Sequence, residues 1–221
     1  MAIHRRRIVE RITRMGERTT STLVPPGTGG YTPPSGIIED TTEAQRLLTE
    51  AGFPGGQGFP VLEYTYSTNS KVHEQIGIEI QQMLLENLGI RINLRPLETK
   101  TYFAEMSLRH FDLIRGAWIG DFDDPANFLD IFESGSGNNR TGWRNTEYDR
   151  LLAAAKRAPG EKDRFALLRD AEGLLVRQES PIVCLFQFRG LYAADPDRIG
   201  GIHPNSIDRH PLWAIYKKAR P

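Results

Sequence analysis

The sequence contains a single cysteine, Cys184, among its 221 residues. One thiol excludes an internal disulfide and any metal site built on two or more cysteines. The five histidines include no pair four positions apart, the spacing that places two imidazoles on one face of a helix. The sequence therefore predicts no zinc site, and no motif in it calls for a cofactor.

The sequence also lacks an excess of charge, because 28 Lys+Arg balance 28 Asp+Glu. Nothing global directs the chain to nucleic acid or anionic lipid, and no nucleic-acid partner is expected. The basic run HRRRIVERITRMGER has apolar residues at helical spacing, which favours a solvated helix face over a nucleic-acid patch. No apolar run approaches the ~18 residues of a membrane span. The N-terminus has no apolar h-region, so no secretory signal peptide is expected.

A strand–helix–strand pattern occupies the middle of the chain. Apolar residues at helical spacing predict a helix from Lys71 to a stop at Gly89, between strands over 61–68 and 90–98. This is the pattern of a βαβ unit with parallel strands and a right-handed crossover. A third strand is predicted over 111–120, which gives an α/β fold with a mostly parallel sheet flanked by helices.

Further elements are predicted on both sides of this unit. The Pro/Gly-rich segment Ser21–Gly36 is open to two interpretations, a linker or an ordered loop laid over a domain. A long apolar strand is predicted from Pro181. The chain is divided into 1–40 (helix and Pro/Gly loop), 41–180 (an α/β ligand-binding lobe) and 181–221 (returning strand and tail). Helices are predicted over 1–18, 41–52 (with a Thr N-cap), 100–110, 146–157 and 161–177.

Three aspartates follow the third predicted strand: Asp121, Asp123 and Asp124. A D-x-D-D cluster is able to donate a proton or to coordinate a divalent cation, but the pattern is weak. Asp124 stands before Pro125 and is predicted mainly to cap the next helix, and Asp123 to cap it or face solvent. Asp121 comes directly off the strand end beside Trp118, where ligands of open α/β sheets bind.

The chemistry of this edge favours the capture of an amine. There is no G-x-S-x-G, no P-loop and no nucleotide-binding glycine motif in the sequence. An ionised Asp121 is suited to pairing with an ammonium, and the face of Trp118 to stacking on a ligand chain. Two alternatives remain: a hydrolase or metal-dependent enzyme that uses the aspartate cluster, and a non-binding truncated remnant.

At this point the sequence resembles a known family. The stretch GAWIGDFDDPANFLDIFESGSGNNRTGWRNTEYDRLL is similar to the C-terminal lobe of the family 5 extracytoplasmic solute-binding proteins of peptide ABC importers. AIHRRRIVERI, TSTLVPPGTGGY, EAQRLLTEAGFPGG and ESPIVCLFQFRGLYAADPDRIGGI are similar to other segments of that lobe, in the same order. The resemblance covers nearly the whole chain.

The resemblance implies a fold, a site and partners. The fold would be a lobe of the periplasmic-binding-protein type II kind with a long returning C-terminal strand, and the protein would bind rather than catalyse. Asp121 would pair with the ammonium of an oligopeptide or other small solute, and Arg115 would meet a carboxylate. The partners would be ABC permease subunits, and the location periplasmic or the cell surface. Residues expected at the ligand are Asp121, Trp118, Arg115, Gly116, Ala117 and Gly120, with no metal and no catalytic residue.

The sequence departs from the family pattern in three respects. His4 stands where the family has an aspartate, and Thr99 stands where it often has a tryptophan. A full family member also carries a signal peptide and a first lobe upstream. The resemblance therefore implies a missing N-terminal lobe that would form the other half of the ligand cleft.

Overall fold

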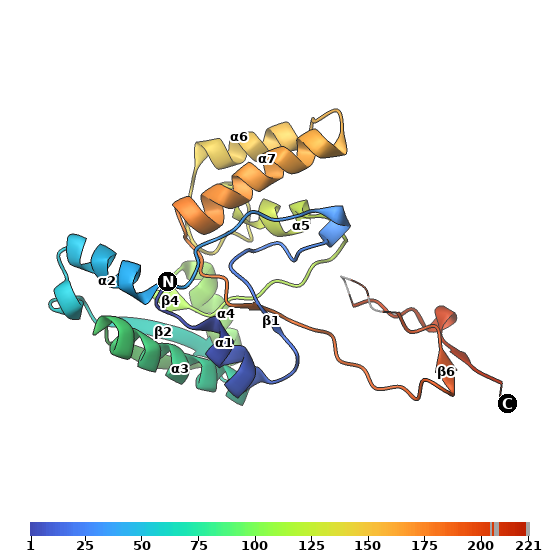
Figure 1. Ribbon diagram of the computed structural model, residues 1–221, viewed down its shortest axis with the longest axis horizontal. Coiled ribbons are helices and arrows are strands. Elements are labelled where there is room, and N and C mark those ends of the chain that lie inside the picture. Colours follow the sequence, from blue (N-terminus) through green and yellow to red (C-terminus); the bar gives the residue numbers. More distant parts are fainter. Residues whose placement is uncertain (204, 206–207, 220–221) are drawn as a thin grey trace.

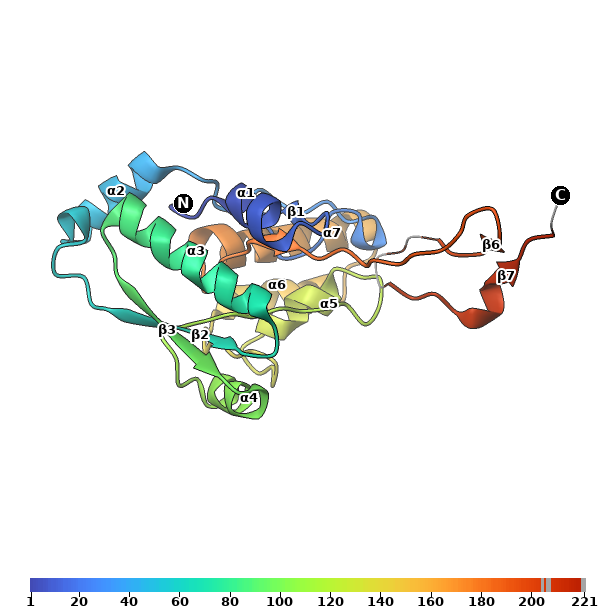
Figure 2. The same cartoon turned by 90° about the horizontal axis from the view of Figure 1, so that it is seen from below.

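The computed structural model of the protein describes residues 1–203, 205 and 208–219 (Figure 1). It shows a body with an α/β part and a helical part, from which a C-terminal arm extends (Figures 1 and 2). In the described part of the chain, no helix has both the length and the apolar composition that a membrane crossing requires.

The central sheet has three parallel strands in the order β3–β2–β4. These are β2 (Leu62–Ser67), β3 (Ile92–Leu97) and β4 (Leu113–Ile114). Helix α3 (Lys71–Leu88) connects β2 to β3, and α4 (Thr99–Leu108) lies on the opposite side of these strands (Figure 2). The predicted βαβ unit is confirmed.

Helix α3 forms where the sequence places its boundary signals. The hydroxyl of Ser70 accepts a hydrogen bond from the backbone N–H of Val72, and Gly89 ends the helix with φ 69°. A Cβ at Gly89 would lie 2.1 Å from the carbonyl oxygen of Gly55, so the close approach of that turn requires glycine. Apolar side chains of α3 and the sheet form one core together with Ile8 of the N-terminal segment and Ile90, which precedes β3: Ile8, Tyr64, Tyr66, Ile76, Ile80, Met83, Ile90 and Ile92.

Helix α2 (Thr41–Glu50) differs from expectation at its first residue. The carboxylate of Asp40 accepts a hydrogen bond from the backbone N–H of Glu43 at 2.9 Å, so Asp40 is the N-cap. The predicted Thr N-cap is wrong, because the aspartate one residue earlier has the extended backbone and the side-chain oxygen that a cap needs.

The helical part contains a second core. It is built by α5 (Ala126–Leu129), α6 (Thr146–Ala155) and α7 (Glu161–Gly173), which continues as a π-helical turn over Leu174–Gln178. Two residues of the Pro/Gly-rich segment, Val24 and Tyr31, are fully buried in this core. Of the two interpretations of that segment, the ordered loop is confirmed.

The N-terminal segment turns earlier than predicted. Helix α1 (Arg5–Ile8) continues as a π-helical turn over Val9–Thr13, and Arg14 then takes a left-handed conformation with φ 55°. The helix predicted over 1–18, with its end near Gly16, therefore ends at Thr13. The next residues form β1 (Arg18–Thr19), which pairs antiparallel with a strand near the other end of the chain.

Two predicted strands are much shorter in the structure. β4 has two residues, because the chain leaves the sheet after the N–H of Arg115 donates to the carbonyl of Thr65. The returning strand is hydrogen-bonded as β5 (Phe186–Gln187) only, opposite the equally short β1. On the arm, β6 (Ile199–Gly200) pairs with β7 (Tyr216–Lys217). Single 3₁₀ turns lie at Thr28–Gly30, Pro54–Gly56, Asp130–Phe132 and Leu212–Ala214.

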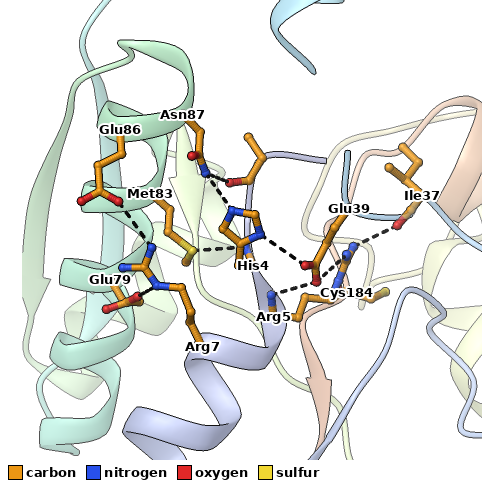
Figure 3. A network of polar contacts seen from close by, with 11 residues as sticks. His4, Arg5, Arg7, Ile37, Glu39, Glu79, Met83, Glu86, Asn87 and Cys184 are labelled. Atoms are coloured by element: carbon orange, nitrogen blue, oxygen red, sulfur yellow. Dashed lines mark hydrogen bonds and ion pairs between the residues drawn. The ribbon is translucent and has the colours of Figure 1, made fainter. Parts of the chain in front are cut away.

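A polar network joins α1 to the rest of the body (Figure 3). The buried guanidinium of Arg5 donates to the carbonyl of Cys184 at 2.8 Å and to that of Ile37 at 3.1 Å. The imidazole of His4, the residue that departs from the family pattern, lies between Glu39 (3.4 Å) and Asn87 (3.4 Å). The N-terminus is thereby tied to α3 and to the returning segment.

Candidate functional site

Three parallel strands end at one edge of the sheet, and polar side chains gather there. The hydroxyl of Ser67, the last residue of β2, lies 3.3 Å from that of Thr99, which begins α4 after β3. Nδ1 of His73, in the first turn of α3, is 3.1 Å from the carbonyl oxygen of Ser67. Because the carboxyl edge of an open α/β sheet is where ligands bind, we take this edge as the candidate site.

Arg115 follows β4 and lies at the same edge. Its carbonyl accepts a hydrogen bond from the hydroxyl of Tyr102. Its half-buried side chain acts electrostatically on His73, whose pKa is lowered first by burial and then by the positive charge of Arg115. Burial raises the pKa of Tyr64 to about 12, and the charge of Arg115 opposes that rise. Within the described residues, no carboxylate forms an ion pair with the Arg115 guanidinium.

Trp118 is oriented by a side chain that the sequence did not single out. The indole Nε1–H donates to Oδ1 of Asn127 at 3.0 Å, and the amide of Asn127 donates to the carbonyl of Phe122 at 3.3 Å. Asn127 is buried at the start of α5, and the half-buried Trp118 ring packs against the helical core. The one sequence signal for Asn127 is its position in the first helical turn, after Pro125. That position predicts a helix cap and does not indicate a hydrogen bond to Trp118.

Asp121 is exposed in the turn between Trp118 and Asp124. Within the described part of the chain its carboxylate has no hydrogen-bond partner. Gly116 and Ala117 are exposed as well, and a Cβ at Gly116 would meet open space. Gly120 differs, because a Cβ there would come within 3.1 Å of the Phe128 ring. Asp121 is therefore free to meet a ligand, whereas packing accounts for Gly120.

The other two aspartates bind parts of the protein. Oδ1 of Asp124 accepts from the N–H of Ala126 at 2.8 Å, which confirms the predicted cap, and also from Nη2 of Arg164 at 2.6 Å. Oδ1 of Asp123 accepts from the backbone N–H of Gly29 at 2.9 Å. Asp123 is exposed, as one of its two predicted placements expects, and it caps no helix. Its contact with the Pro/Gly-rich loop was not predicted.

The structure thus places Arg115 and His73 after the carboxyl ends of neighbouring strands, and Trp118 and Asp121 on the loop that follows β4. It does not assemble the three aspartates into one group. Within residues 1–203, 205 and 208–219, no three His, Cys, Asp or Glu side chains come together as a metal-binding group. His73 and Asn127 are the two residues of this site that sequence reasoning missed.

Comparison with known proteins places the chain among solute-binding proteins. Residues 1–140 match the family described as bacterial extracellular solute-binding proteins, family 5, middle region. The dipeptide-binding protein DppE of Bacillus subtilis is 31% identical, over 97% of this chain and 40% of the relative. The periplasmic murein peptide-binding protein MppA of Escherichia coli is 33% identical, over 85% of this chain and 36% of the relative.

Solved structures agree with these relatives. The oligopeptide-binding protein OppAIV of Borrelia burgdorferi superposes with a TM-score of 0.85 at 30% identity, covering 98% of this chain and 43% of that one. The murein tripeptide-binding protein MppA of Escherichia coli superposes with a TM-score of 0.78 at 32% identity, over 85% and 37% of the two chains. The chain therefore spans about two fifths of the length of these proteins.

Proposed function

Because the chain belongs to the bacterial extracellular solute-binding proteins of family 5, we propose that it captures a short peptide for an ABC importer. The observation that carries the proposal is a pair of charges after β4: within the described residues, neither the exposed carboxylate of Asp121 nor the half-buried guanidinium of Arg115 has an ionic partner. A peptide with free ends has an ammonium and a carboxylate, and is complementary to these two charges.

Asp121 is proposed as the group that binds the ammonium. Its exposed carboxylate accepts charge-assisted hydrogen bonds, which are roughly twice as strong as neutral ones. The Trp118 ring lies three residues away and offers an apolar face to the first residues of the ligand. The exposed backbone of Gly116 and Ala117 is available to pair with the main chain of an extended peptide.

Arg115 and His73 are proposed to bind the opposite end of the ligand. A guanidinium and an imidazole at the carboxyl edge form a site for a carboxylate, and the guanidinium is suited to bidentate binding. Burial and the positive charge of Arg115 both lower the pKa of His73, so the free imidazole is disfavoured as a cation. A carboxylate between the two would favour the protonated imidazole and offset the effect of Arg115.

The proposed protein partners are the permease subunits of the ABC importer, as expected for this class of protein. The proposed site of action is the periplasm or the outer face of the cell. Since the chain spans about two fifths of its relatives, a second lobe of the kind that they contain would cover the peptide from the other side. Domain closure over the ligand would then complete the site.

The alternative of an enzyme built on the three aspartates has less support. Asp123 and Asp124 are engaged by Gly29, Ala126 and Arg164, so only Asp121 is free to act on a ligand. A single exposed carboxylate supplies neither the metal cage nor the acid–base pair that such an enzyme needs. The remaining alternative, a folded remnant without a ligand, is an outcome of the following experiment.

Thermal unfolding of the purified chain against short peptides tests the proposal. A ligand that binds only the native state raises the midpoint by mass action. We expect peptides with a free N-terminus to raise it, and N-acetylated peptides to do so less. Asp121→Ala should weaken binding by about 1.5 kcal/mol or more, roughly tenfold. Asp170→Ala, at an exposed position of α7, is the control for a lost exposed carboxylate. No shift with any peptide would contradict binding by this chain.

A further inference from the structure

The Pro/Gly-rich segment Ser21–Gly36 forms a closed loop against the helical core, and we name it the brace loop. Its two ends touch, because a Cβ at Gly36 would lie 1.9 Å from the carbonyl oxygen of Ser21. The N–H of Gly36 also donates to the Ser21 hydroxyl at 3.3 Å. Val24 and Tyr31, one on each limb, are fully buried. The loop is therefore a fixed part of the body.

One buried carboxylate fastens both limbs of the brace loop. Glu172 of α7 has no exposed surface, and its Oε1 accepts from the N–H groups of Leu23 and Val24, both at 2.9 Å. Its Oε2 accepts from the hydroxyl of Tyr31 at 2.9 Å. The Tyr31 ring also meets Phe165 edge-on, with centroids 5.5 Å apart. Nε of Arg169 also donates to the carbonyl of Thr32 at 3.2 Å, so five contacts fix the loop on α7.

The tip of the brace loop touches the turn that carries the proposed ligand residues. The N–H of Gly29 donates to Oδ1 of Asp123 at 2.9 Å. A Cβ on Gly29 would lie 2.9 Å from the carbonyl oxygen of Asp123, and φ at Gly29 is +53°. Both facts favour glycine at the tip, since a side chain would push the two backbones apart.

The turn over residues 118–124, named here the ligand loop, is held at three points. Asn127 holds the indole of Trp118, the brace loop holds Asp123, and Arg164 of α7 holds Asp124. Asp121 lies between the first and second of these points. The backbone on either side of the proposed ammonium-binding carboxylate is therefore fixed by groups that do not themselves meet the ligand.

We propose that the brace loop positions the ligand loop for peptide binding, with Asp123 and Gly29 as the positioning residues. This inference rests on the function proposed above. A site that is held in place before the ligand arrives has less order to gain on binding, so its affinity is higher. Freeing the ligand loop at Asp123 should therefore weaken peptide binding although Asp123 does not contact the peptide.

Fluorine NMR of the chain labelled with 5-fluorotryptophan tests this directly. The chain has three tryptophans, so Trp118 gives one of three resonances, and Trp143 and Trp213 serve as internal references. We expect Asp123→Ala and Gly29→Ala each to shift or broaden the Trp118 resonance and leave the other two unchanged. The same two substitutions should weaken peptide binding about fivefold or more.

Two matched variants distinguish the positioning effect from a general loss of stability. Asp123→Asn keeps an oxygen that accepts from Gly29, and should restore both the resonance and the affinity. Gly27→Ala places a side chain at another positive φ of the same loop, +91°, where nothing lies within 4 Å of the new Cβ. Gly27→Ala should lower the stability of the chain about as much as Gly29→Ala does, and should leave the Trp118 resonance unchanged.

The outcomes are distinct. An unchanged Trp118 resonance in Asp123→Ala would contradict the proposal that the brace loop positions the ligand loop. A change of equal size in Gly27→Ala would contradict it as well. If Gly29→Ala does not fold, the comparison of Asp123→Ala with Asp123→Asn still decides, because Asp123 is exposed. If the unsubstituted chain binds no peptide, the proposed function fails, while the Trp118 resonance continues to report on the brace.

Discussion

Glu172 accepts a hydrogen bond from the hydroxyl of Tyr31 at 2.9 Å, across 141 positions of the chain. The same carboxylate accepts hydrogen bonds from two backbone N–H groups. Its ionised form is nevertheless disfavoured. Burial raises the pKa of Glu172 to about 7, and the three hydrogen bonds offset only part of that effect. The folded state therefore binds a proton at this residue more readily than the unfolded chain does.

This relationship predicts a pH dependence of stability. The folded pKa is raised from 4.5, so the stabilising contribution of the protonated carboxyl is complete below about pH 4.5 and is lost as the pH rises through 7. Each unit of the difference is worth about 1.4 kcal/mol. The free energy of unfolding of Glu172→Gln, measured with a denaturant, should change less between pH 5 and 8 than that of the unsubstituted chain. Glu179→Gln, at an exposed position, should keep the original slope, and an unchanged slope in Glu172→Gln would contradict the assignment.

A second pH dependence is expected in ligand binding. Burial and Arg115 lower the pKa of His73 in the free protein, so this imidazole is neutral at neutral pH. A peptide carboxylate beside it would raise that pKa, and binding would take up a proton. Calorimetry should show tighter binding at pH 5.5 than at pH 7.5, by several-fold. His73→Gln should flatten this difference, as should a C-terminal amide on the peptide. A slope that persists in His73→Gln would place the carboxylate elsewhere.

The helical core contains a buried hydroxyl whose removal has a definite cost. Tyr148 has no exposed surface, and its hydroxyl donates to the carbonyl of Leu129 at 2.7 Å. Tyr148→Phe would leave that carbonyl without this donor, and we expect a loss of about 1–2 kcal/mol in the free energy of unfolding. Tyr216→Phe on the exposed arm is the matched control, and should change the free energy of unfolding by less than about 0.5 kcal/mol. Equal effects of the two would show that the Tyr148 hydrogen bond is not stabilising.

Arg5 should tolerate lysine poorly. Its guanidinium donates in two directions, to the carbonyls of Ile37 and Cys184, and its side chain is buried (Figure 3). A lysine ammonium lacks the planar fork that reaches both. Chemical denaturation should show Arg5→Lys destabilised by about 1–3 kcal/mol, because one buried carbonyl loses its partner. Arg6→Lys, on the exposed side of the same helix, should be neutral. A neutral Arg5→Lys would mean that water replaces the lost donor.

Local signals in the sequence predicted the elements whose boundaries depend on neighbouring residues. Helix α3 was confirmed over Lys71–Leu88 because its Ser70 cap, its Gly89 stop and its apolar stripe are all short-range features. The third strand and the returning strand were predicted too long. Apolar runs indicate burial, but a strand also needs a partner with free N–H and C=O groups, and β4 and β5 have such partners over two residues each.

For the site as well, short-range sequence signals were informative and long-range contacts were not. Trp118, Asp121 and Arg115 stand at a strand end that the sequence marks, so they were predicted as ligand residues, and they remain a proposal. The cap at Asp124 was confirmed because Pro125 follows it directly. The exposure of Asp123 was predicted, but its hydrogen bond with Gly29 was not, since Gly29 is 94 positions away and no local pattern indicates the contact. His73 was missed for the same reason, because its neighbour Arg115 comes from a different strand end.

The pairing of β1 with β5 has a consequence for the order of folding during synthesis. Arg18 lies opposite Gln187, so β1 has no strand partner until the chain as far as Gln187 has been made. At about 5–20 residues per second, that delay is on the order of ten to thirty seconds. Over this time the edge of β1 is open to other chains at the ribosome exit. A chaperone that covers Arg18–Thr19 until Phe186 and Gln187 have been made would keep this edge from pairing with other chains.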